Sequence, residues 1–200
     1  MSWRSTPSWV FGGAVFLSAN AGYLNTVGYL ASHRAGLTHV TGQVTRIGIE
    51  LGAGAFGGGL RALMVVGWFF FGAVVSGVLI SQSELSDRGG RYSLALLVEA
   101  LLLLLATGLL RARHMWGINL VALAAGLQNA MASSYAGAVV RTTHMTGIVT
   151  DLGVMLGRAL KGSWPEPRKV WLLLGLFGGF LAGGGVGTVL QPHLGDWAFL

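Results

Sequence analysis

The sequence predicts an all-α, polytopic membrane protein built from two repeats, and three observations carry this prediction. Of the 200 residues, 53% are hydrophobic and only 10% are charged, whereas soluble proteins carry roughly 25% charged residues. Long runs have at most one charge. A polar, glycine-rich phrase occurs twice, 105 residues apart, as "THVTGQVTRIGIELG" at 38–52 and "THMTGIVTDLGVMLG" at 143–157, with nine of fifteen positions identical.

Five apolar runs give the expected membrane spans in chain order. A helix needs about 20 apolar residues to cross the hydrocarbon of a bilayer. Four runs contain no charge, and the fifth contains the single acid Glu99. The runs are Ser5–Ser32, Ala62–Ile80, Tyr92–Leu110 (with Glu99), Met115–Val140 and Val170–Pro192.

The two polar-glycine phrases lie between these spans and predict discontinuous half-helices. Threonine and glycine before a short apolar stretch are typical of a helix start, so we expect helices to begin near Thr41 and Thr146. In the second copy, Leu152, Met155, Leu156 and Ala159 follow at helical spacing. A helix N-terminus inside a membrane presents free N–H groups and a positive dipole end, which favours an anion or a carbonyl group as ligand.

Shorter matches extend the duplication along the chain. "AGYLN" at 21–25 aligns with "AGLQN" at 125–129, and "FGAVVSG" at 71–77 aligns with "FGGFLAG" at 177–183. We therefore expect one membrane domain over residues 1–200, with a first repeat at 9–81, a linking helix at 92–110 and a second repeat at 115–190. Internal repeats of this kind are common in secondary transporters, whose substrate sites form where the repeats meet.

The duplicated polar residues form the predicted substrate site. Its expected members are Asn25, His39, Thr41, Gly42, Asn129, His144, Thr146 and Gly147. Arg46 and Asp151 occupy equivalent positions with opposite charge, which predicts a buried ion pair. Glu99, alone in its span, is either a proton-coupling group or a neutralised packing residue.

The leading function is a secondary transporter or facilitator of a small solute, and the alternative is a membrane scaffold without transport activity. We expect no enzyme activity, no cofactor and no resident metal, although His39 and His144 with Glu50 or Asp151 have metal-ligand chemistry. "GAGAFG" at 52–57 follows no strand, so a nucleotide site is not expected. Gly179, Gly183 and Gly187 at four-residue spacing predict close helix packing or a homodimer.

Positive loop charges explain the net charge of +6 better than a nucleic-acid partner, and they orient the chain. Counting lysines and arginines by loop places the N-terminus in the cytoplasm by eight against four, whether the chain crosses seven times or crosses five times with two re-entrant segments. Seven crossings would make the repeats parallel, and five would make them inverted. Segment length favours seven.

The ordered set of motifs resembles a known family. An "AG" helix with a polar residue, a Thr-Gly segment, "GLQNA" at 126–130 and a second Thr-Gly segment are similar to the YoaK-type proteins. These are small bacterial inner-membrane proteins grouped as a domain of unknown function. The resemblance covers about 9–190 and implies a multi-pass protein of the bacterial inner membrane that transports small molecules.

Overall fold

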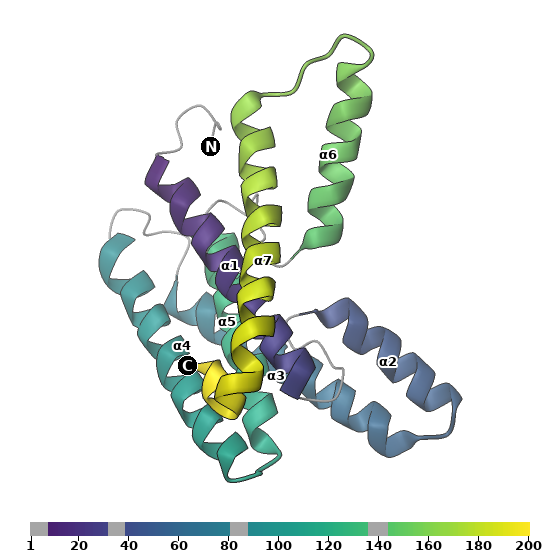
Figure 1. Cartoon of the computed structure of the whole chain (residues 1–200), viewed down its shortest axis with the longest axis vertical. Helices are drawn as coiled ribbons and strands as arrows, with labels where there is room; N and C mark the ends of the chain where they lie inside the picture. The colour runs from purple at the N-terminus through teal and green to yellow at the C-terminus, as the bar shows by residue number, and fades with distance from the viewer. Residues whose placement is uncertain (1–7, 32–38, 81–87, 136–143) are drawn as a thin grey trace.

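The all-α prediction is confirmed for the part of the chain that the structure describes. The computed structural model describes residues 8–31, 39–80, 88–135 and 144–200, which contain seven α-helices and one 3-10 helix but no strand (Figure 1). The elements are α1 (Ser8–Ala31), α2 (Val40–Gly52), α3 (Phe56–Leu79), α4 (Arg88–Arg111), α5 (Trp116–Tyr135), α6 (Met145–Ala159), α7 (Pro167–Leu194) and η2 (Gly195–Phe199).

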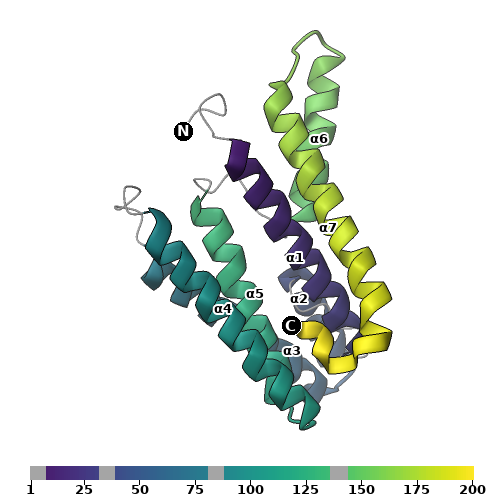
Figure 2. The ribbon, with the colours of Figure 1, turned by 60° about the vertical axis from the view of Figure 1, so that its left-hand side comes forward.

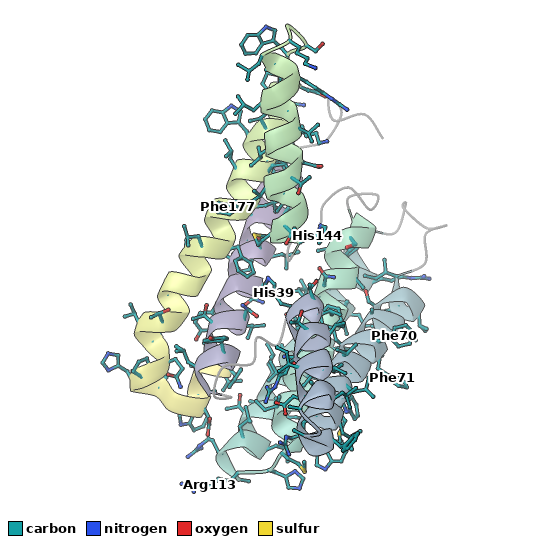
Figure 3. The ribbon with its side chains drawn as sticks, turned by 90° about the vertical axis from the view of Figure 1, so that its right-hand side faces the viewer. His39, Phe70, Phe71, Arg113, His144 and Phe177 are labelled. Carbon is teal, nitrogen blue, oxygen red and sulfur yellow. The ribbon has the colours of Figure 1, made fainter. Side chains whose placement is uncertain are left out.

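Three helical stretches among the described residues are long and apolar enough to cross a membrane: α3, the part of α4 from Gly90 to Arg111, and Pro167–Phe199. Large apolar side chains remain exposed on them. Phe70 and Phe71 point outward from α3 (Figure 3), and each is more than 60% exposed. Exposed apolar surface of this extent is costly in water but suits contact with lipid, so the helices suggest a membrane protein.

Four of the long helices pack in two pairs, and α4 packs against one of these pairs. α1 lies along α7, and α5 packs against both α3 and α4 (Figure 2). α1 and α5 have the length of spans but carry several polar residues, and they are not among the three stretches that are apolar enough to cross a membrane. A buried core joins α1, α3, α4, α5 and η2 through Leu24, Val27, Val65, Ala106, Val121, Ala122, Ala198 and Phe199.

The contact between α1 and α7 is so close that main chain touches main chain. A Cβ atom added at Gly22 would collide with the carbonyl oxygen of Phe180, and one added at Gly183 would collide with the carbonyl oxygen of Ala19. Small residues at four-residue spacing allow this approach between membrane helices. The glycine row predicted on the last helix is therefore buried within this chain, at Gly179, Gly183 and Gly187.

The contact between α3 and α5 repeats this arrangement. A Cβ atom at Gly72 would collide with the carbonyl oxygen of Leu123, and one at Gly126 would collide with the carbonyl oxygen of Phe69. Each pair thus has one glycine on either helix, and each glycine faces a carbonyl group of its neighbour. No residue with a side chain fits these four positions without separating the helices.

The two helices that begin in the duplicated phrase are short. α2 has 13 residues and α6 has 15, which corresponds to about 20 and 22 Å at 1.5 Å per residue. Their first turns lie near the middle of the molecule, and the helices run away from each other toward opposite ends (Figures 1 and 3). α2 packs on α3 and α6 packs on α7.

The "GAGAFG" segment forms the turn between α2 and α3. Gly54 has a φ of 72°, a left-handed conformation that favours glycine, and α3 begins at Phe56. The carboxylate of Glu50 fills the space beside Gly58, in the first turn of α3, where the helix dipole favours negative charge. The glycines therefore serve a tight helix-to-helix connection.

The packing predicts that alanine is tolerated at some glycines and not at others of the same helices. Gly72→Ala and Gly183→Ala should each lower stability by about 1–3 kcal/mol through overpacking. Gly67 and Gly185 have no neighbour within 4 Å of an added Cβ, so Gly67→Ala and Gly185→Ala are matched controls and should be neutral or slightly stabilising. Thermal unfolding in detergent measures all four. Equal effects of the two classes would contradict the close helix contact.

Candidate functional site

Both duplicated phrases begin a helix one residue before the predicted position. α2 begins at Val40 and α6 at Met145, each directly after a histidine, and no side chain caps either first turn. The backbone N–H groups of a first helical turn have no partner within the helix. The sequence therefore places two uncapped helix starts at equivalent positions. The phrases also include Thr38 and Thr143, which lie outside the described residues.

His39 connects the start of α2 to two long helices. Its Nδ1 lies 3.2 Å from Oδ1 of Asn25 on α1, a hydrogen bond in which the histidine N–H donates. Its ring meets the edge of the Phe180 ring of α7, with 5.5 Å between ring centroids. The predicted neighbours Asn25 and His39 are thus brought together, and Phe180 joins them without having been predicted.

His144 is placed differently from His39. It is exposed, its side chain forms no hydrogen bond with the residues that the structure describes, and its ring lies against Gly147 of its own helix. Asn129, the equivalent of Asn25, is half-buried on α5 and its carbonyl oxygen accepts a hydrogen bond of 2.8 Å from Ser133. The contact formed by His39 and Asn25 has no counterpart between His144 and Asn129.

The threonines divide into two matched classes. The hydroxyl groups of Thr45 and Thr150 donate to the carbonyl oxygens of Thr41 and Thr146, at 3.0 and 2.9 Å, and so serve their own helices. The side chains of Thr41 and Thr146 are exposed in the first turn, as is Gly42. Among the described threonines of the two phrases, Thr41 and Thr146 are therefore the ones whose hydroxyl groups can meet a ligand.

Arg46 and Asp151 do not pair with each other as the sequence predicted. Arg46 Nε lies 3.5 Å from Glu50 Oε1 one turn along α2, and Asp151 Oδ2 lies 3.8 Å from Lys169 Nζ on α7. The reason is the direction of the helices. α2 and α6 run away from each other after their first turns (Figure 3), so the side chains of their second turns are far apart. Arg46 therefore pairs within α2, and Asp151 pairs with the neighbouring helix α7.

Glu99 is buried in α4, where its Oε1 accepts a hydrogen bond of 3.3 Å from Nδ2 of Asn20 on α1. Neither Asn20 nor the buried Gln43 of α2 was among the predicted site residues. Both could have been found from their amide side chains, since polar groups at membrane depth are usually functional or paired.

No metal site is assembled from the described residues. They contain no group of three or more histidine, aspartate or glutamate side chains that could hold an ion. The carboxylates considered as ligands, Glu50 and Asp151, are each paired with a basic side chain.

The comparison with known proteins gives one finding. Residues 13–200 match a family described as a protein of unknown function (DUF1275). No curated protein and no solved structure gives a significant match.

The His39–Asn25 contact should anchor the start of α2. His39→Ala and Asn25→Ala should each destabilise the fold, and the double variant should lose less than the sum, with a coupling of about 0.5–1.5 kcal/mol for the shared hydrogen bond. His144→Ala is the control, and it should change stability little because His144 is exposed. Unfolding measurements on the four variants give the coupling. Additive losses for His39→Ala and Asn25→Ala would show that the contact contributes nothing.

Proposed function

This chain belongs to the DUF1275 family of proteins of unknown function, and we propose that it is a secondary transporter or facilitator of a small solute. The observation that carries the proposal is the arrangement of α2 and α6. Two short helices begin in the same phrase, have uncapped first turns near the middle of the molecule, and run toward opposite ends. We place the solute between these first turns.

The chemistry of the two helix starts favours an anion or a solute with a carbonyl group. Each N-terminus carries about half a positive charge from the helix dipole, and each adds free N–H donors. The exposed hydroxyls of Thr41 and Thr146 add further donors. Such polar surface at membrane depth is stable where it faces a water-filled cavity or other protein, and costly where it faces lipid.

The glycine contacts support a pair of structural repeats, α1–α3 and α5–α7. Gly22 against Phe180 corresponds to Gly126 against Phe69, and Gly183 against Ala19 corresponds to Gly72 against Leu123. These contacts relate α3 to α7 by an offset of 111 residues, as do their first residues, Phe56 and Pro167.

The alignment of "FGAVVSG" with "FGGFLAG" gave an offset of 106 for the same helices, and we propose the offset of 111 in its place. The difference has a simple physical origin. α6 is longer than α2, and the connection after it, 160–166, is longer than the connection 53–55. Glycine and phenylalanine recur along both helices, so a five-residue slip still matches letters, but only the larger offset matches the glycines that face carbonyl groups.

We propose five crossings with two re-entrant helices, in place of the seven crossings that segment length favours. The end of α1 and the start of α3 lie at the same end of the molecule, and so do the end of α5 and the start of α7 (Figure 2). The short helices α2 and α6 therefore add no crossing, and they enter from opposite sides. This topology makes the repeats inverted.

The charge distribution orients this topology. The start of α4 and the α6–α7 connection lie at one end (Figure 2), with six described basic residues: Arg88, Arg91, Arg158, Lys161, Arg168 and Lys169. The other end holds three: Arg61, Arg111 and Arg113. By the positive-inside rule the first end is cytoplasmic, which puts the N-terminus in the cytoplasm. The membrane that we propose is the inner membrane of a bacterial cell.

The unequal histidines support alternating access between the repeats. By the offsets of the three helices, the partners of His144 that correspond to Asn25 and Phe180 are Asn129 and Phe69. His39 is docked on its partners, whereas His144 is exposed. Inverted repeats reach two access states by exchanging conformations, so the second state would dock α6 and release α2.

Cysteine labelling tests the crossings, since the chain contains no cysteine. Ala53 and Ser163 are exposed in the α2–α3 and α6–α7 connections. Ala53→Cys should react with a membrane-impermeant thiol reagent from the periplasmic side, and Ser163→Cys only after the membrane is opened. Seven crossings would place both residues in the cytoplasm, so protection of both in sealed cells would refute the five-crossing topology.

The solute site is tested by removing single hydroxyl groups. A panel of sulfate, phosphate and short carboxylates is first screened for thermal stabilisation of the purified chain, and the best solute is then measured for binding and for saturable uptake into proteoliposomes. The Thr41→Val and Thr146→Val double variant should bind it at least ten-fold more weakly, a loss of about 1.4 kcal/mol.

The matched control for this experiment is the Thr45→Val and Thr150→Val double variant, whose hydroxyls serve their own backbone. It should bind the solute like the wild type. If the Thr41 and Thr146 variant binds normally but melts earlier, these residues pack helices and the scaffold function gains.

A further inference from the structure

One acid is buried in the helix bundle away from the proposed solute site. Glu99 lies near the centre of α4 and is 4% exposed. Oε1 accepts a hydrogen bond from Asn20, while Oε2, also buried, has no hydrogen-bond partner among the described residues. Half of this carboxyl group is thus unsatisfied in an apolar interior.

Among the described residues, the helices around Glu99 supply no compensating positive charge. The described helices α1 and α5 contain no aspartate, glutamate, lysine, arginine or histidine. The nearest basic residues of α4 are Arg91 and Arg111, which lie about 12 and 18 Å away along the helix axis at 1.5 Å per residue. Arg61, near the start of α3, is the only charged residue of that helix, and Asp196 is the only one of η2.

An isolated carboxylate in such a place is unstable. Burying an ionised carboxyl group without a partner costs far more than burying the neutral acid, and a buried ion pair would need a cation that these helices do not supply. The side chain in contact with Glu99 offers an N–H donor, whereas a bound metal cation would require oxygen ligands. A proton is the cation that fits.

Two further polar side-chain atoms are buried on α3 and α5. Ser76 Oγ on α3 and Gln128 Nε2 on α5 have no hydrogen-bond partner in the described part of the chain. Each follows a member of one apolar cluster that also includes Val98, the residue before Glu99; the two members are Val75 and Leu127. Residues adjacent in sequence to this cluster are thus buried and polar on α3, α4 and α5.

We propose that Glu99 is a proton-binding site. In this site Glu99 is the neutral acid, and the proton passes to water when a movement of α1 relative to α4 admits water, leaving a carboxylate hydrogen-bonded by Asn20. The step that couples this proton to solute movement rests on the proposed function, but the protonation itself does not. The site would make the coupling ion of the transporter a proton.

Infrared spectroscopy of the full chain in lipid nanodiscs tests the site without a transport assay. At neutral pH the wild type should show the C=O stretch of a protonated carboxylic acid, and Glu99→Gln should abolish it. Glu50→Gln is the matched control and should retain the band, because Glu50 is partly exposed and paired with Arg46. Absence of the band in the wild type, or its persistence in Glu99→Gln, would overturn the proposal.

A second pair of variants distinguishes proton binding from a purely structural role, and it also covers the case in which Glu99→Gln fails to fold. Oε1 of Glu99 accepts the hydrogen bond of Asn20, so Asn20→Ala removes that bond and should shift the frequency of the C=O stretch. Asn25→Ala, on the same helix but bonded to His39, should leave it unmoved. Identical frequencies in all three proteins would show that the band does not come from the carboxyl group bonded to Asn20, and this would refute the proton site. Solute binding by the threonine variants is a separate readout, so the two proposals can fail independently.

Discussion

The rest of the structure depends on the contact of main chain with main chain at four glycines. Because Gly22, Gly72, Gly126 and Gly183 each face a carbonyl group, α1 and α7 on one side and α3 and α5 on the other pack closer than side chains would permit. Membrane helices gain little from the hydrophobic effect within lipid, so such packing is a main source of their association. It fixes the two pairs from which α2 and α6 extend.

The two short helices lie outside this close packing. α2 and α6 bury one position each, Gln43 and Ile148, which are equivalent in the duplicated phrase. The remainder of both helices is largely exposed, including threonine and glycine that lipid would not favour. Elements with few buried contacts move at low cost, whereas the glycine-packed pairs do not. The alternating access that we propose requires such a difference, in which the helix starts move and the glycine-packed pairs stay fixed.

The sequence predicted the parts of the fold that local chemistry decides. Helix class and the starts of α2 and α6 followed from apolar length and from the Thr-Gly phrase, and the buried glycine row of α7 followed from its spacing. The offset between α3 and α7 from matching letters differs from the one that we propose from the contacts, because letters cannot distinguish glycines that face a carbonyl from those that face open space. The pairing of Arg46 and Asp151 depended on the direction of two helices, which no local pattern records. The Asn20–Glu99 contact joins residues 79 positions apart and needed the tertiary packing to be seen.

The proposed transport function depends on a solute between the first turns of α2 and α6. A density map of the full chain in lipid nanodiscs, with the best-binding anion of the panel present, tests this placement. We expect non-protein density for the solute or its hydrating water between the two helix starts, within hydrogen-bonding distance of Thr41 or Thr146. Helix starts filled by protein side chains, or covered by a second copy of the chain with no solute density, would contradict it.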